Sequence, residues 1–78
     1  MHMTDGQQDV AIRGDMIRLG QLLKLAGIAQ DGGEAKAMLT AGHVHVNGEV
    51  ELRRGRQLHP GDVVRAGGEA LRVVVGAA

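Results

Sequence analysis

The sequence predicts an α+β domain in which a two-helix hairpin packs on a small antiparallel β-sheet. Three observations lead to this prediction. Apolar residues recur with helical spacing between residues 19 and 42, and they alternate with polar residues between 43 and 52. Short β-branched segments follow at 63–65 and 70–75, with the turn signal Gly67-Gly68 between them.

The length of the chain limits it to one small domain. The 78 residues carry nine basic and nine acidic side chains, so the formal net charge is zero. The first 15 residues are polar and lack sustained periodicity, so we expect a flexible tail at 1–15 and a single domain at 16–76. Within the tail, the alternation of Val10 and Ile12 is compatible with a short edge strand.

The first helix is expected in LGQLLKLAGI, residues 19–28. Its leucine-rich stripe has the spacing i, i+3, i+4, i+7 of a single helix face, formed by Leu19, Leu22, Leu23 and Ala26. Lys24 falls on the other side and should be solvated. Gly27 provides the left-handed conformation that ends a helix, and Ile28 can pack back on the last turn.

A second helix follows in DGGEAKAMLTAG, residues 31–42. Asp31 with Glu34 three residues later resembles a capping box, in which Asp31 is the N-cap. The expected buried stripe consists of Ala35, Met38 and Leu39. Lys36 points away from this stripe, and Gly42 ends the helix.

A β-hairpin is expected next. Apolar and polar residues alternate in HVHV, residues 43–46, and again in EVEL, residues 49–52. Asn47-Gly48 between them is a strong turn signal, because both residues tolerate positive φ. Glu49 and Glu51 alternate with the apolar residues of the return strand, and we expect both acids on its solvent face.

The composition excludes several classes of function. The chain has no Ser, Cys, Tyr, Trp or Phe, so it lacks serine, cysteine and tyrosine nucleophiles, cysteine zinc ligands and aromatic rings for stacking bases. We expect no enzyme activity, no cofactor and no small-molecule substrate. His43, His45 and His59 lack a metal-binding pattern and are interpreted as solvated histidines rather than metal ligands.

No membrane association is expected either. No apolar run reaches the roughly 20 residues of a membrane span, and the absence of cysteine fits a reducing compartment. The sequence therefore favours a cytoplasmic location.

The positive charge is concentrated in one segment. Arg53, Arg54 and Arg56 lie within four positions, and residues 17–65 together hold seven basic and five acidic side chains, a net charge of +2. Guanidinium groups match the oxygens of phosphate, so the cluster is a candidate phosphate-binding site. A solvated loop, partly neutralised by neighbouring acids, is the alternative interpretation.

The motifs, taken in order, resemble a known family. A leucine-rich helix, Gly-Gly-Glu-Ala-Lys, Gly-x-Val-x-Val-Asn-Gly, Arg-Arg-Gly-Arg and Pro-Gly-Asp-Val-Val run from about Ile17 to Val64. This order is similar to that of the S4 domain, an RNA-binding domain named after the fourth protein of the small ribosomal subunit, and above all to its small stand-alone bacterial members. The resemblance implies the αL-type RNA-binding motif and a partner among structured RNAs, such as ribosomal or transfer RNA.

The resemblance also implies which residues contact RNA. Lys36 and the three arginines Arg53, Arg54 and Arg56 correspond to contacts with the sugar–phosphate backbone, while Lys24 and the hairpin tip Asn47-Gly48 are further candidates. Gly33-Glu34 departs from the family, since many members have Ser-Arg at this point of the second helix. Without aromatic residues, recognition should favour helical or junction RNA by shape.

Two other functions remain open from the sequence. One is a protein-interaction module that docks on a ribosomal or other partner protein and uses the hairpin as a sheet edge. The other is a DNA-binding domain, for which a helical pair and a basic segment are superficially suitable. A ribosomal protein is therefore a possible second partner beside RNA.

Overall fold

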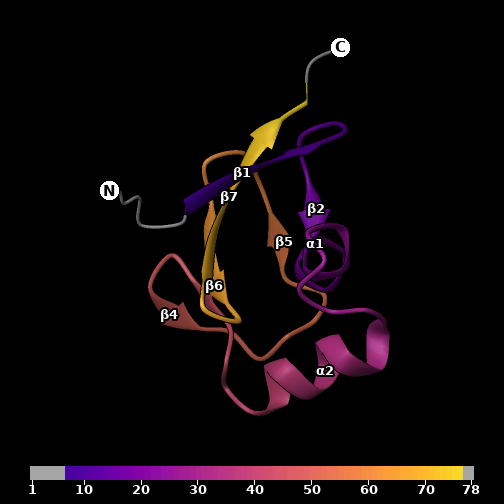
Figure 1. Ribbon diagram of the computed structural model, residues 1–78. Coiled ribbons are helices and arrows are strands. Elements are labelled where there is room, and N and C mark those ends of the chain that lie inside the picture. The colour runs from indigo at the N-terminus through magenta and orange to yellow at the C-terminus, as the bar shows by residue number, and fades with distance from the viewer. Residues whose placement is uncertain (1–6, 77–78) are drawn as a thin grey trace, which may run out of the picture.

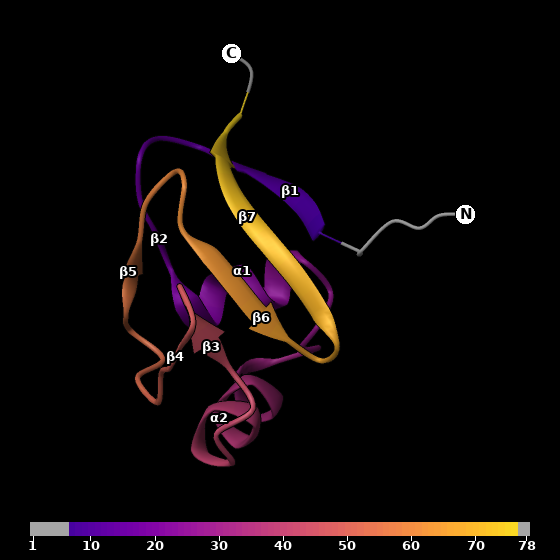
Figure 2. The ribbon, with the colours of Figure 1, turned by 90° about the vertical axis from the view of Figure 1, so that its left-hand side faces the viewer.

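The computed structural model describes residues 7–76 and contains two helices and two β-sheets (Figure 1). The larger sheet has five strands in the order β1-β7-β6-β3-β4. In Figure 2 it lies in front of α1, and α2 lies at the end of the sheet near β3 and β4. The strands of this sheet are β1 (Gln7–Ile12), β3 (His45–Val46), β4 (Glu49–Val50), β6 (Val63–Ala66) and β7 (Glu69–Val75).

A second, two-stranded sheet fastens the start of the first helix. Its antiparallel strands are β2 (Ile17–Arg18) and β5 (Gln57–Leu58). β2 runs directly into α1 (Leu19–Leu25), so the pairing of β2 with β5 ties the segment before β5 to the beginning of α1. The second helix is α2 (Gly32–Thr40), which contacts α1.

The hydrophobic core lies between the helices and the sheets. The predicted helical stripes are confirmed, since Leu19, Leu22 and Leu23 are fully buried and Ala26 and Met38 pack against the core. Their buried partners come from α2, from the sheets and from the segment before β3: Ala35, Leu39, Val44, Val46, Leu58, Val64, Leu71 and Val73. Lys24 and Lys36 are exposed, as expected.

The helix ends follow the sequence signals. The Asp31 carboxylate accepts a hydrogen bond from the Glu34 backbone N–H at 2.8 Å, which confirms Asp31 as the N-cap. The Glu34 carboxylate accepts from the backbone N–H of Gln30 at 2.7 Å, one residue before the position expected for a capping box. Gly27 and Gly42 end the helices with φ of 77° and 78°.

The larger sheet is mixed, so the prediction of an antiparallel sheet was wrong for one pair of strands. β1 runs parallel to β7, from Gln7 opposite Ala70 to Ile12 opposite Val75. Residues 7–12 of the expected tail thus form the edge strand that Val10 and Ile12 indicated, and residues 1–6 lie outside the described part. An exposed ion pair between Arg72 Nε and Asp9 Oδ1, 3.2 Å apart, links the two strands.

The hairpin has the predicted turn, but the residue directly after its return strand, Glu51, faces inward. Asn47 and Gly48 have φ of 52° and 89°, so a two-residue turn places Val46 opposite Glu49. The backbone N–H of Glu51 in turn bonds to Val44 O at 3.0 Å, so Glu51 faces inward with Val44.

The expectation that Glu51 lies on the solvent face was therefore wrong. Its relative exposure is 7%, whereas the apolar Val50 and Leu52 are 53% and 60% exposed. The turn fixes the backbone register, which sets Glu51 opposite the buried Val44 despite the polarity of its side chain. Glu49, in contrast, is exposed as expected.

No helix within residues 7–76 is long and apolar enough to cross a membrane. The same residues contain no group of three or more His, Asp or Glu side chains that could hold a metal ion.

The N-cap provides a first test of these assignments. Replacing Asp31 with Ala removes the acceptor for the Glu34 N–H, so we expect the free energy of unfolding to fall by about 1 kcal/mol. Urea titration followed by circular dichroism measures this change. Lys36→Ala on the same helix serves as the control and should change stability by less than about 0.5 kcal/mol. Equal effects of the two substitutions would contradict the capping role.

Candidate nucleic-acid interface

One buried carboxylate organises the arginine-rich loop at residues 52–56. Glu51 Oε2 accepts hydrogen bonds from the backbone N–H groups of Leu52 at 3.1 Å and Arg53 at 3.0 Å, and from Arg53 Nε at 3.0 Å. Glu51 Oε1 accepts from Arg53 Nη2 at 3.2 Å and from Arg56 Nη1 at 2.7 Å. Both ends of the loop are thus attached to a single side chain.

These contacts keep Glu51 ionised. The side-chain hydrogen bonds from Arg53 and Arg56, followed by the Arg53 backbone N–H, lower the pKa of Glu51 to about 2, against the effect of its burial. The same interaction raises the pKa of Arg53. At neutral pH, Glu51 is therefore a carboxylate that offsets part of the charge of Arg53 and Arg56.

The loop also docks on the beginning of α1. The backbone N–H groups of Leu19 and Gly20 donate to the carbonyl oxygens of Arg56 at 2.8 Å and Arg54 at 2.9 Å. These N–H groups belong to the first turn of a helix, which has no intrahelical partners for them. The loop carbonyl groups therefore accept hydrogen bonds from two otherwise unpaired N–H groups at the start of α1.

Gly20 permits this close approach. A Cβ atom at position 20 would lie 2.5 Å from Arg54 Cγ and 3.5 Å from Arg54 O, so the Arg54 side chain crosses directly over the glycine. The Arg54 guanidinium extends toward the start of α2, where its Nη1 would lie 3.9 Å from a Cβ on Gly32.

Three cations from three different elements line one open groove at this point. We call it the basic groove and define it by Arg18 of β2, Lys24 of α1 and Arg54 of the loop. All three side chains are exposed, and within residues 7–76 none of them forms an ion pair with a carboxylate. The remaining lining is small or neutral and consists of Gly20, Gln21, Gly32, Ala35 and Gly55.

A second hollow adjoins the loop. It is lined by Arg53, Arg56 and His59, together with Gly55 and Gln57. The Arg53 side chain remains 75% exposed although it binds Glu51, whereas that of Arg56 is 33% exposed. Gly55 borders both hollows, so they meet at the arginine loop.

The structure distributes the predicted contact residues over this surface unequally. Lys24 and Arg54 meet in the basic groove, while Arg53 and Arg56 lie at the second hollow and hold Glu51. Lys36 is exposed on α2, directly after the groove residue Ala35.

The hairpin tip has a structural function. The Asn47 amide donates to Asp62 Oδ1 at 3.1 Å and accepts from the Val63 backbone N–H at 2.9 Å. Both ends of this side chain are therefore occupied within the protein, and Gly48 next to it is exposed at the turn.

Arg18 is the groove residue that sequence reasoning missed. It stands alone before the leucine stripe, far in sequence from the arginine cluster, and contacts the loop through a long hydrogen bond from Nη1 to Gly55 O at 3.4 Å. The only available signal was its position at the start of α1, which the loop covers.

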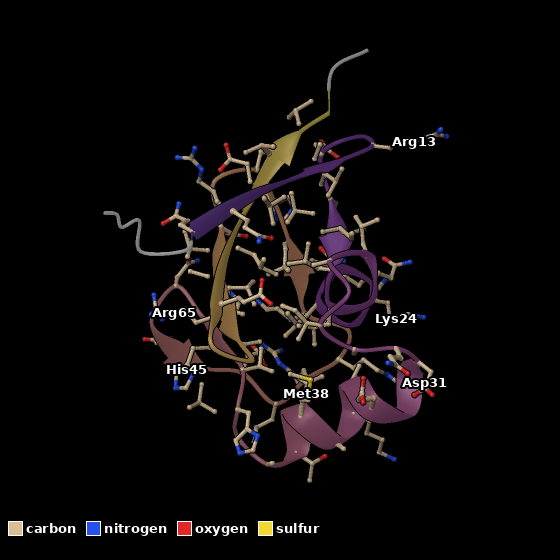
Figure 3. The ribbon with its side chains drawn as sticks, viewed as in Figure 1. Arg13, Lys24, Asp31, Met38, His45 and Arg65 are labelled. Carbon is tan, nitrogen blue, oxygen red and sulfur yellow. The ribbon has the colours of Figure 1, made fainter. Side chains whose placement is uncertain are left out.

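Other cations lie away from the groove. In Figure 3, Lys24 and Asp31 are on the helical side of the molecule, whereas His45 and Arg65 are on the opposite side and Arg13 projects from the far end. The exposed positive charge is therefore not spread uniformly, because three unpaired cations gather beside the helices.

The fold and the groove define a small α+β domain that presents unpaired cations at the junction of its helices. The sequence model of the S4 domain family matches residues 10–74. The chain therefore belongs to the S4 domain family of RNA-binding proteins. This confirms the family that the motifs indicated. The match includes part of β1, which lies outside the motif resemblance.

Two curated relatives are similar over most of their length. The probable ribosome maturation protein RlbA of Bacillus subtilis is 51% identical over 59 residues, which cover 76% of this chain and 83% of the relative. The putative RNA-binding protein YbcJ of Escherichia coli is 36% identical over 58 residues, which cover 74% of this chain and 83% of the relative.

The pKa of Glu51 predicts an acid-dependent loss of stability. Because its pKa falls from an ordinary 4.5 to about 2 on folding, the ionised contacts stabilise the protein above pH 4.5, and this contribution disappears as the pH drops toward 2. We expect Glu51→Gln to lower the free energy of unfolding by roughly 1–3 kcal/mol at pH 7, with a smaller difference from the wild type near pH 2.5. Urea titrations at both pH values measure it, and a difference independent of pH would contradict the assignment.

The contact between Gly20 and Arg54 gives a second prediction for the site. Gly20→Ala should displace the loop, because the new methyl group overlaps Arg54 Cγ, at a cost of roughly 1–3 kcal/mol in stability. Gly32→Ala is the control, since its Cβ makes only an ordinary contact with Arg54 and should be tolerated. Nuclear magnetic resonance shifts of the loop amides, with urea titration, report both effects. An unchanged loop in Gly20→Ala would show that Arg54 does not pack there.

Proposed function

We propose that this protein binds structured RNA without catalysis, through the basic groove and the cations that border it. The observation that carries the proposal is the convergence of Arg18, Lys24 and Arg54 on one groove without carboxylate partners among the described residues. Unpaired cations on a folded surface attract a polyanion, and the chain belongs to an RNA-binding family.

The chemistry of the groove suits the sugar–phosphate backbone. Arginine offers a planar set of donors to phosphate oxygens, and lysine adds a compact charge. The glycines in the lining lack side chains, so a phosphate can come close to the protein backbone there. Lys36 would extend the contact along α2, and Arg53 and Arg56 would extend it across the loop, with Gly48 as a further backbone contact.

The shape of the RNA should matter more than its base sequence. The chain has no aromatic residue on which unpaired bases could stack. Contacts from a rigid groove to phosphates favour helical or junction RNA, in which the phosphates have fixed spacing.

Ribosomal RNA is the partner that we propose, in preference to transfer RNA. Support comes from the Bacillus subtilis relative, whose name assigns it to ribosome maturation, and from the RNA-binding name of the Escherichia coli relative. A partner of this kind would place the protein in the cytoplasm and bring ribosomal proteins near its outer surfaces.

Neutralising the groove should abolish most of the affinity. We expect Arg18, Lys24 and Arg54, all replaced by Gln, to weaken binding to refolded bacterial ribosomal RNA roughly 100-fold at 0.15 M salt. The log–log salt slope should become shallower by about 2 to 3, since about three phosphate contacts are lost. Filter binding over a salt series measures both quantities.

A matched variant separates the groove from net charge. Arg13, Arg65 and Arg72 replaced by Gln remove the same charge from other parts of the surface, and we expect less than a threefold change in affinity. Equal losses in the two triple variants would refute the groove as the site. Tighter binding to duplex DNA than to duplex RNA of the same sequence, or wild-type binding to transfer RNA alone, would refute the proposed partner.

A further inference from the structure

We infer that Glu51 is a positioning residue for RNA binding, because it fixes the arginine loop so that Arg54 occupies the basic groove before RNA binds. This inference rests on the proposed function. It assigns a part in RNA binding to Glu51, a residue with the same sign of charge as RNA. By charge alone, a carboxylate beside a phosphate-binding surface should weaken binding. The geometry of the loop indicates instead that Glu51 strengthens binding.

Glu51 holds the loop from both ends. Its carboxylate accepts five hydrogen bonds, two from the backbone at Leu52 and Arg53 and three from the side chains of Arg53 and Arg56. A carboxylate has about four lone-pair sites, so these five hydrogen bonds use its full acceptor capacity. A loop with three neighbouring like charges is thereby held in one conformation, although repulsion among them would otherwise spread it.

The same contacts divide the three arginines into two groups. Arg53 and Arg56 bind Glu51 and line the second hollow, whereas Arg54 lies over Gly20 and lines the basic groove. Within the described residues, Arg54 has no acceptor for its guanidinium, so all its donors are available to a ligand. By binding Arg53 and Arg56, Glu51 therefore fixes the loop in the conformation that places Arg54 in the basic groove.

Positioning of this kind strengthens binding by lowering the entropy lost on association. A long side chain that is already held near its bound conformation loses less freedom when it contacts a phosphate. The Arg54 backbone is fixed by its carbonyl bond to Gly20 N–H, and the loop conformation that allows this bond depends on Glu51. Loss of the carboxylate should release Arg54 from the groove even though it frees two more positive charges.

Two isosteric substitutions separate positioning from charge. Glu51→Gln and Glu49→Gln each remove one negative charge, but Glu49 is exposed and forms no side-chain hydrogen bond or ion pair among the described residues. If charge alone mattered, both would bind refolded ribosomal RNA more tightly. We expect Glu51→Gln to bind about tenfold more weakly than the wild type and Glu49→Gln to bind at least as tightly as the wild type.

A double-mutant cycle tests whether Glu51 acts through Arg54. Filter binding at 0.15 M salt compares the wild type, Glu51→Gln, Arg54→Ala and the double variant. We expect Glu51→Gln to have less than a twofold effect when Arg54 is absent. An undiminished tenfold effect in that background would assign Glu51 a general structural role and overturn the inference.

Hydrogen exchange of the wild-type protein tests the role of Glu51 without any variant, so this test does not require Glu51→Gln to fold. The amide protons of Leu52 and Arg53, which donate to Glu51, should exchange at least tenfold more slowly than in an unstructured peptide. Unprotected amides would overturn the inference.

Failure of the inference is distinguishable from failure of the proposed function. A wild type that does not bind structured RNA refutes the function, whatever the state of the loop. A wild type that binds RNA, while Glu51→Gln binds as tightly as Glu49→Gln, refutes only the role of Glu51.

Discussion

The candidate site depends on one electrostatic constraint, an ionised carboxylate that is held almost out of water. Burial of Glu51 is unfavourable unless its oxygens are satisfied, and here two backbone N–H groups and two guanidiniums satisfy them. The desolvation cost is reduced because Arg53 remains largely in solvent. A domain of this size, without disulfides or aromatic residues, has few means of making a loop rigid, and this polar cluster is one of them.

The position of Arg54 in the basic groove depends, through several steps, on the hairpin turn. The turn at Asn47-Gly48 sets the register, the register buries Glu51, and Glu51 fixes the loop that carries Arg54. Gly20 allows that loop to lie against α1, and β5 continues the attachment by pairing with β2. The cations of the groove thus come from segments that are separate in sequence but share a single rigid support.

Local features of this fold were predictable, and non-local ones were not. The stripe through Leu22 and the cap at Asp31 depend on neighbours within a few residues, so the sequence alone indicated them. The inward position of Glu51 could also have been derived, because a two-residue turn sets it opposite Val44. The apolar character of Val50 and Leu52 suggested the reverse.

The parallel pairing of β1 with β7 has no local signal, and the only signal for the position of Arg18 in the groove is its place at the start of α1. The paired residues of the two strands are 63 positions apart in the chain, as for Gln7 and Ala70, and no turn motif connects the strands. The motif resemblance indicated the S4 family correctly, but only the fold separates Arg54 from Arg53 and Arg56. The same β1–β7 pairing has a consequence for biosynthesis. The first strand cannot begin to pair with its neighbour until residue 70 has left the ribosome, so the earliest strand of the sheet waits for the latest one.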